Sequence, residues 1–340
     1  MGITLHHTVR ALSTCSSPPF VIATDAHARR TSESSREFLA TRPAGAYTTA
    51  RTCAGCSKIF EWETHVRRTA GSARAMIGAA GISGLENLCD PLALRERLDR
   101  SVAAAVMKYR ELEAPGKGGG DMGELKVTIL VSWKGDATSV VETHISPLPP
   151  LPQKPVRVEV RGAPRSDATS KDSTWVTERA PLEELMRAAD SPEGCGAVNE
   201  FLMTNDDGEV YEGSQTNFFA LGFAGVGETE PFLQTAGEGV LEGTVRRLLL
   251  EVCQNEGIKV NFSPPRIEDC YGSRPVFHAC FISSTSRLLL PVDELYIPPD
   301  GDFSREAHLM RKFDRIPIVD KLVKLVNQEV ENHSTPIACK

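Results

Sequence analysis

The pattern of apolar and polar positions predicts one amphipathic helix, and helix-start signals predict a second helix. One opens at Gly243-Thr244, where apolar residues begin to recur at helical spacing, at 245, 248, 249 and 252. The other is expected over 91–112, with Asp90 as its cap and Pro91 in its first turn. The free N–H groups at the start of the first helix would form a natural phosphate site.

Apolar runs and residues that favour β-structure predict the strands. A strand at 276–282 runs into Ser283, Ser284 and Thr285, hydroxyl residues of the kind that complete a phosphate cradle. The S-P-L-P-P-L-P run at 146–152 is expected to be a stiff connector between two domains, with a ligand for a proline-binding module as the alternative. The other expected strands are 20–24, 45–52, 125–133 and 139–145.

A carboxylate and an amide lie five residues apart in the run E-G-S-Q-T-N-F-F, which begins at Glu212. The run follows a hairpin-type turn at 205–208 and leads into an apolar strand, so Glu212 and Asn217 are expected at the edge of a buried sheet. A buried ionised Glu is costly unless it meets a cation or a strong donor. Taken alone, the run also fits a β-bulge or an edge strand with a solvated Glu.

Four pieces in this order resemble the class IV aminotransferases, the fold-type-IV pyridoxal-phosphate (PLP) enzymes. This family includes branched-chain and D-amino-acid aminotransferases and aminodeoxychorismate lyase. The pieces are the H-V-R-R run at 65–68 on a helix, the run from Glu212, the Gly-Thr helix start and the hydroxyls from 283 to 285. The resemblance covers about 43–330. It implies a two-domain α+β protein of the D-amino-acid aminotransferase-like PLP fold, with PLP in the cleft between the domains.

The resemblance also implies roles for individual residues. Glu212 and Asn217 match the family motif E-G-x-x-x-N-x-F, in which the Glu pairs with the pyridine nitrogen of PLP. The expected cofactor-phosphate ligands are Arg68, Thr244, Val245, Ser284 and Thr285. Thr69 stands where the family usually has Leu, and Thr244-Val245 replaces the usual Ile-Thr. Neither departure removes a charge.

The Schiff-base lysine is expected before Glu212, on a strand that enters the same pocket. Lys171 is the only lysine within 162–200, and Trp175 matches the large residue that family members carry four or five positions later. The spacing of 41 residues (212 − 171) is longer than in the bacterial enzymes, and an extra surface loop at 190–198 accounts for the excess. An exposed lysine without a role is the alternative.

The implied activity moves an amino group between an amino acid and a 2-oxo acid through the lysine Schiff base. A lyase of the aminodeoxychorismate lyase type and a non-catalytic relative are the alternatives. The strand at 45–52, the W-x-x-H-x-x-R helix and the K-D-S-x-W segment look closest to a plant and algal branch with poorly defined substrates. The substrate signatures Tyr-x-Arg-Pro, Arg-x-His and Lys-x-x-Asn-Arg of three subfamilies are absent.

Composition agrees with an enzyme of this kind. The 340 residues, 41% hydrophobic and 24% charged, suffice for two domains with proper cores. A net charge of −7 and a pI near 5.7 argue against nucleic acid or an anionic membrane as the main partner, and no apolar run approaches a membrane span. Cys53 and Cys56 form one C-x-x-C, but no second pair or nearby His completes a zinc site. No metal is therefore expected, and the cysteines are expected to be reduced structural thiols.

Four regions are expected along the chain. They are a variable N-terminal extension at 1–24, an N-terminal α+β domain at 25–147, a Pro-rich linker at 148–155 and a C-terminal PLP-binding domain at 156–340. The extension lacks Asp and Glu, as transit peptides do, but Arg10 is its only arginine, whereas transit peptides are rich in arginine. A cytoplasmic location is therefore expected, with plastid or mitochondrion as the alternatives.

The glycine-rich run at 116–120 has no preceding strand and no GxGxxG spacing, so a surface turn is expected there. The resemblance implies a homodimer. Phe60 and Trp62 suit either a subunit interface or the core.

Overall fold

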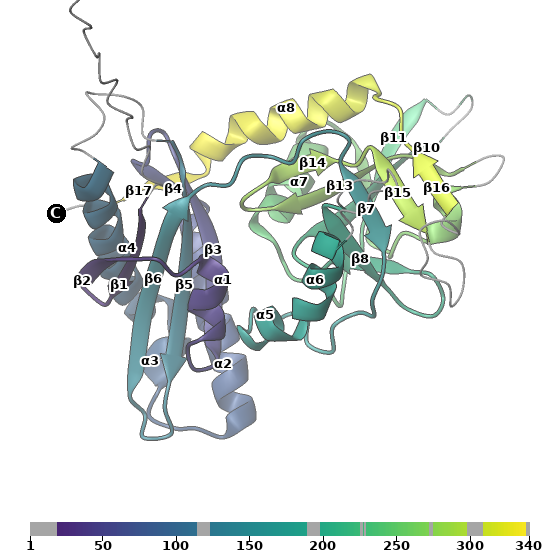
Figure 1. Ribbon diagram of the computed structural model, residues 1–340. Coiled ribbons are helices and arrows are strands. Elements are labelled where there is room, and N and C mark those ends of the chain that lie inside the picture. Colours follow the sequence, from purple (N-terminus) through teal and green to yellow (C-terminus); the bar gives the residue numbers. More distant parts are fainter. Residues whose placement is uncertain are drawn as a thin grey trace, which may run out of the picture.

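The computed structural model describes residues 19–113, 123–188, 198–224, 227, 229–271, 275–297 and 309–337. Two β-sheets with their helices form two lobes, which lie left and right in Figure 1. The run at 116–120, and all but Val198 of the expected surface loop, lie outside the described residues.

The first lobe is built on a seven-stranded sheet with the order β17-β4-β3-β5-β6-β1-β2, and every neighbouring pair is antiparallel. All four strands predicted in this part of the sequence are present, two of them one or two residues longer. The strands are β1 Phe20–Thr24, β2 His27–Thr31, β3 Gly45–Cys53, β4 Lys58–Phe60, β5 Leu125–Trp133, β6 Ser139–Pro147 and β17 Ser334–Pro336.

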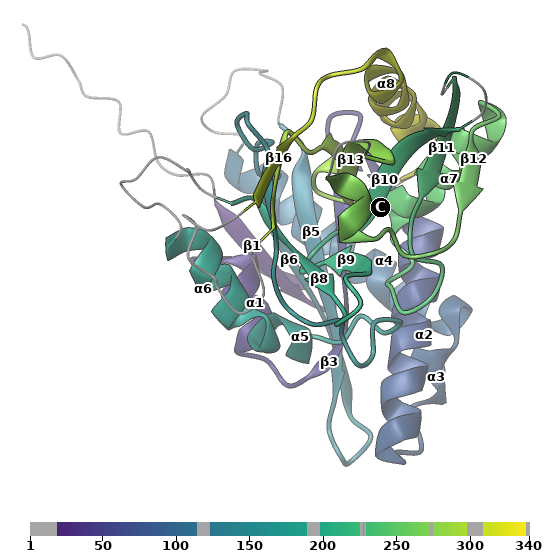
Figure 2. The same ribbon diagram turned by 90° about the vertical axis from the view of Figure 1, so that its right-hand side faces the viewer.

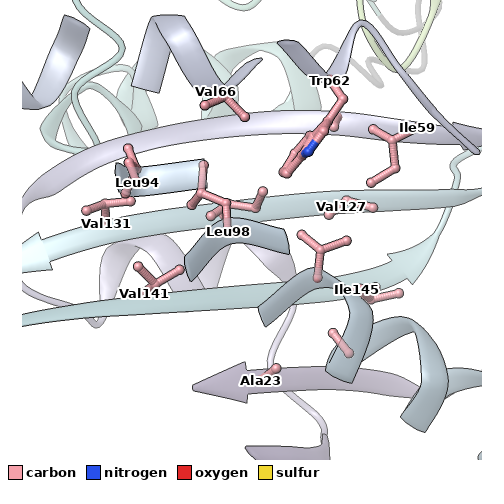
Figure 3. Close-up of a cluster of buried hydrophobic side chains, with 14 of the residues drawn as sticks. Ala23, Ile59, Trp62, Val66, Leu94, Leu98, Val127, Val131, Val141 and Ile145 are labelled. Carbon is pink, nitrogen blue, oxygen red and sulfur yellow. The ribbon is translucent and has the colours of Figure 1, made fainter. Parts of the chain in front are cut away.

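Helices cover both faces of this sheet because its strands carry apolar residues on both sides. Val127 and Val131 of β5 face the core under α2 and α4 (Figure 3). Leu130 belongs to a separate core on the opposite side of the sheet. The predicted cap holds, since Leu92 N donates to Asp90 Oδ1 at 2.9 Å. Figure 2 shows α1 and α2 on opposite sides of the sheet. These helices are α1 Ser35–Ala40, α2 Trp62–Ala80, α3 Glu86–Cys89 and α4 Pro91–Glu113.

The second lobe is built on a ten-stranded sheet in which β10 pairs with β9, β11 and β13. The predicted turn at 205–208 joins β8 to β9, with Gly208 N donating to Asn205 O at 3.1 Å. The strands are β7 Arg157–Val160, β8 Glu200–Thr204, β9 Val210–Gly213, β10 Asn217–Ala224, β11 Glu230–Gln234, β12 Lys259–Asn261, β13 Phe277–Ser284, β14 Leu288–Pro291, β15 Glu294–Ile297 and β16 Leu309–Lys312.

Helices α7 and α8 cover one face of this sheet. Phe219 and Leu221 of β10 point toward them, whereas Phe218 and Ala220 belong to a second core formed by the strands themselves. Helix α8 runs along the top of Figure 1 from the second lobe to the first, where the chain continues into β17. The remaining helices are α5 Thr174–Glu178, α6 Ala180–Ala188, α7 Thr244–Asn255, η2 Ile267–Cys270 and α8 Pro317–Asn332.

The structure departs from the expected division of the chain at two places. Residues 20–24, expected in a variable extension, form the buried strand β1, and residues 334–336, expected in the C-terminal domain, pair with β4 of the first sheet. No helix or strand lies between β6 and β7, where the linker is expected. Phe60 and Trp62 are buried in the cores, so their expected alternative as interface residues is wrong.

Candidate active site

A cavity of about 600 Å³ is lined by residues of both lobes. Side chains of β3 and β5 contribute to one wall, and residues of β9, β10 and the start of α7 contribute to another. The structure brings every predicted site residue to this cavity: Arg68, Lys171, Glu212, Asn217, Thr244, Val245, Ser284 and Thr285.

Lys171 is held at the junction of the lobes by its backbone. Its N–H donates to Ser72 Oγ of α2 at 3.0 Å, and its carbonyl accepts from Tyr47 N of β3 at 2.9 Å. Asp172 forms an isolated bridge with Ala46. Lys171 therefore lies on a loop fastened to β3, and the expectation that it lies on a strand is wrong.

The side chain of Lys171 is partly buried, and its Nζ lies 4.6 Å from the centre of the Tyr47 ring. Burial lowers the pKa of Lys171 to about 8, with Arg68, Arg179 and Arg165 adding to the effect and Tyr47 opposing it. Burial alone would raise the pKa of Tyr47, but Lys171 and Arg179 outweigh it and bring that pKa down to about 7. An amine with this pKa is partly neutral near pH 7, as a nucleophilic lysine must be.

Glu212 is buried inside the second sheet, because β9 pairs with both β8 and β10. The expected position at a sheet edge is therefore wrong, and the alternative of a solvated Glu is wrong with it. Burial raises the pKa of Glu212, and Arg165 and the Leu241 N–H oppose that rise. Arg165 Nη2 and Nε lie 2.6 and 2.8 Å from Oε1, and Leu241 N donates to Oε2 at 3.1 Å.

Asn217 is paired with Glu212 across β9 and β10, and the two side chains hold the same loop. Asn217 Nδ2 donates to Leu241 O at 2.7 Å, while Glu212 accepts from Leu241 N. A Cβ at Gly243 would collide with Asn217 Oδ1. The motif therefore fixes the segment that leads into α7, and Gly243 is required by the close approach of Asn217.

The hydroxyl end of the cavity comprises Arg68, Thr244, Ser284 and Thr285. Thr244 is the first residue of α7, and no side chain caps the free N–H groups of that helix start. Thr244 Oγ1 lies 3.0 Å from Thr285 Oγ1, and Ser284 is the last residue of β13. Arg68 reaches this end from α2, where Nη1 donates to Glu242 O at 3.3 Å.

Several buried donors around the cavity have no hydrogen-bond partner among the described residues. They include Arg68 Nε, Thr216 Oγ1 and Ser283 Oγ. Burial lowers the pKa of Arg68 to about 10, so the guanidinium keeps its charge at neutral pH. Arg67, by contrast, is exposed. Buried donors are seldom left unpaired, so this lining fits an anion with several acceptor oxygens, such as a phosphate.

Further charged or polar side chains line the cavity and were not predicted, among them Tyr47, Lys126, Arg165 and Arg179. Arg165 had a sequence signal, since it lies six residues before Lys171 in the same loop. The other three come from β3, β5 and the junction of α5 with α6, and no motif links them to Glu212.

Neither a membrane-spanning helix nor a metal-binding cluster is found in the part of the chain that the structure describes. No described helix is long and apolar enough to cross a membrane. No group of three His, Cys, Asp or Glu side chains in the described ranges could hold a metal ion.

Comparison with known proteins identifies relatives of the whole fold. The family model for amino-transferase class IV matches residues 45–295. A hypothetical aminotransferase from Mycobacterium tuberculosis, in its PLP-bound form, is 18% identical with a TM-score of 0.63 and aligns 92% of this chain with 99% of that one. No curated protein sequence matches the chain significantly.

A branched-chain aminotransferase from Thermoproteus uzoniensis, solved with norvaline, is similarly close. It is 19% identical with a TM-score of 0.62, and the alignment covers 94% of this chain and 99% of that one. These likenesses confirm the predicted fold class, a fold-type-IV α+β architecture.

Proposed function

The chain belongs to the class IV aminotransferase family, and from that premise we propose that it is a PLP-dependent aminotransferase with Lys171 as its Schiff-base lysine. The observation that carries the proposal is the shared cavity. A lysine with a lowered pKa, a buried carboxylate and the hydroxyl end, where Arg68 Nε has no hydrogen-bond partner among the described residues, all line it. These three features match the aldehyde, the ring nitrogen and the phosphate of PLP.

Lys171 rather than Lys126 is the proposed Schiff-base lysine. Both lysines line the cavity, but the positive charge of Lys171 acts on Glu212, whereas Lys126 Nζ donates to Ser35 Oγ at 2.8 Å. When bound, PLP supplies an electron sink conjugated to the substrate amine. The Lys171 amine attacks as a nucleophile when neutral, and Nζ then carries the substrate α-proton from one carbon to another.

Glu212 holds the ring nitrogen in its protonated state. The carboxylate is fixed on both oxygens, by Arg165 and by Leu241 N, so it can accept a further hydrogen bond without reorienting. Arg165 also supplies the cation that makes a buried carboxylate tolerable. The guanidinium of Arg165 lies 5.3 Å from the Trp175 ring centre, which limits its movement.

The hydroxyl end holds the phosphate. Arg68 contributes a charge-assisted donor, and the N–H groups of Thr244 and Val245 at the start of α7 point toward the same end. The hydroxyls of Ser284 and Thr285 add donors at the end of β13. The chain thereby anchors the cofactor at its phosphate and leaves the opposite end of the cavity for the substrate.

The proposal is tested by amino-group transfer. Purified protein with PLP should convert L- or D-amino acids in the presence of 2-oxoglutarate or pyruvate, with the acceptor consumed in proportion to the oxo acid formed. Oxo-acid formation without acceptor consumption would indicate a lyase. No conversion of any amino acid would support a non-catalytic relative.

The lysine assignment is tested separately. Borohydride reduction of the PLP-loaded protein followed by peptide mapping should place the pyridoxyl group on Lys171. A label on Lys126 would overturn the assignment, because that is the other lysine of the described cavity lining. Lys171→Ala should lose activity by roughly a thousandfold, given that general acid–base catalysis alone contributes about 10²–10⁴.

We also propose that the chain forms a homodimer, as the family resemblance implies. Light scattering should give a mass near twice that of the 37.0 kDa chain. A monomer that still binds PLP and transfers amino groups would refute this arrangement.

A further inference from the structure

The substrate end of the cavity carries more positive charge than the cofactor requires. The ion pair of Arg165 with Glu212 is internally neutral, and Arg287 lies 3.4 Å from Glu200. Arg68 faces the hydroxyl end, and Lys171 reacts with the cofactor. After these assignments, Lys126, Arg179 and Arg36 still line the cavity.

These three cations and Glu183 form one group, here called the cation cluster. Arg179 Nε lies 2.7 Å from Glu183 Oε1, and Arg36 Nε lies 3.4 Å from Glu183 Oε2. Lys126 makes no ion pair among the described residues. One carboxylate thus faces three cations. Two positive charges are in excess while the neighbouring Tyr47 hydroxyl, whose pKa is about 7, is protonated, and the approach of a substrate dianion favours that protonated form.

The cation cluster adjoins the reacting lysine. Arg179 Nη1 lies 3.4 Å from the Tyr47 hydroxyl, and the Tyr47 ring lies beneath Lys171. Lys126 projects from the same face of β5 as Thr128 and Leu130, the face that Tyr47 occupies on β3. Arg36, Lys126 and Arg179 share no hydrogen-bond or ion-pair partner among the described residues with Arg68, whose partners are Thr48, His65 and Glu242. The Tyr47 hydroxyl acts on both Arg68 and Arg179.

An amine that stays charged in a partly buried wall is unfavourable unless an anion approaches it. A monocarboxylic substrate would bring one negative charge to this end of the cavity, and a dicarboxylic substrate would bring two. The two excess charges of the cation cluster match the second case. The cluster is also chemically distinct from the hydroxyl end, since it offers ammonium and guanidinium groups and no helix start.

We infer that Lys126 and Arg179 form a substrate anion site that selects dicarboxylic amino acids and their 2-oxo acids over monocarboxylic ones. This inference rests on the proposed function for the reaction itself. Lys126 binds one carboxylate directly. Arg179, held by Glu183, binds the other and remains against Tyr47. The absence of the known substrate signatures in the sequence agrees with a recognition site built from other residues.

Binding of unreactive acids tests the inference without transamination. Glutarate and butyrate carry no amino or oxo group, and their affinities for PLP-saturated protein can be measured by calorimetry. The parent protein should bind glutarate about 10-fold or more tightly than butyrate, since a charge-assisted bond contributes about 10- to 100-fold. Lys126→Met should lose about 10-fold or more for glutarate and far less for butyrate.

Matched variants separate charge from folding. Lys134→Met alters an exposed lysine just beyond β5 and should leave both affinities unchanged. Lys126→Arg keeps the charge and should retain the preference for glutarate. Arg179→Gln offers a second measurement if Lys126→Met does not fold, and should also weaken glutarate selectively.

Two results would overturn the inference. Equal losses for both acids in Lys126→Met would show a site for a single carboxylate only, and unchanged glutarate affinity in both variants would show no site at all. If the parent protein transfers no amino group but Lys126→Met lowers its affinity for glutarate, the proposed function is refuted and the anion site stands. A protein that transfers amino groups but shows no preference for glutarate would refute the anion site and leave the proposed function standing.

Discussion

The hydroxyl end and the cation cluster lie in one cavity but are built in different ways. The hydroxyl end uses the boundaries of regular elements, because Thr244 begins α7 and Ser284 ends β13. The cation cluster takes Arg36 from α1, Lys126 from β5 and Arg179 from the residue between α5 and α6. In the cation cluster, the position of each charged group depends on the direction of a long side chain.

The difference teaches which parts of a site are fixed by backbone. At a helix start, the N–H groups point outward whatever the side chains are, so the site follows from the position of the helix. In the cation cluster, only tertiary packing decides where a cation goes. We therefore expect the hydroxyl end to determine how the cofactor is held, and the cation cluster to determine which substrate is accepted.

Glu212 lines the same cavity, and among Glu212, Arg68 and Tyr47 it is the residue whose change should have the largest effect. Glu212→Gln keeps the shape but loses the ion pair with the pyridine nitrogen, so kcat should fall by about 100-fold or more while PLP affinity changes little. Stopped-flow turnover and equilibrium dialysis measure the two quantities. Glu230→Gln, at an exposed position at the start of β11, serves as the control. A Gln variant that turns over like the parent would show that Glu212 is not the partner of the ring nitrogen.

The sequence was sufficient for the parts of the site carried by contiguous motifs. Glu212 and Asn217 are paired in register across two strands, and the Gly-Thr helix start lies where the apolar period begins, so local pattern and final geometry agree. Lys171, the lysine chosen from the sequence, also lines the cavity, although it lies on a loop instead of a strand.

The remaining parts required the folded chain. Lys126 alternates with core residues along β5, and nothing in that alternation distinguishes a cation facing a cavity from one facing water. The edge position expected for Glu212 failed for a similar reason, because β10 returns to pair with β9 only once the sheet has formed. Strand β17 joins the first sheet from more than 270 residues away, a pairing that no local signal carries.

Arg68 provides a direct test of the hydroxyl end. Arg68→Ala should weaken PLP binding by about 10- to 100-fold, because one charge-assisted contact to the phosphate is lost. Equilibrium dialysis measures the affinity, and the preference for glutarate over butyrate should stay the same at saturating PLP. Arg67→Ala is the matched control, since the neighbouring side chain is exposed. If Arg67→Ala weakened binding and Arg68→Ala did not, the phosphate would lie elsewhere.

The smallest expected effect is a pH dependence at Lys171, to which both ends of the cavity contribute. Burial is the main cause of its pKa of about 8, and Arg68 from one end and Arg179 from the other add to the lowering. Only the neutral amine attacks the aldehyde, so capture of PLP by cofactor-free protein should quicken as pH rises. Between pH 7 and pH 9, the neutral fraction rises by about 10-fold for a group with this pKa.

The rate can be followed by absorbance after mixing. The cofactor phosphate stays almost fully doubly ionised over this range, so its titration contributes little to the profile. Tyr47→Phe removes the phenolate that raises the pKa of Lys171, so the midpoint of the profile should move to lower pH. Tyr296→Phe, which changes a tyrosine that does not line the cavity, should leave the midpoint in place. A capture rate that is flat from pH 7 to pH 9 would show that Lys171 is already neutral throughout, and that the cations of the two ends hold its pKa lower than the structure indicates.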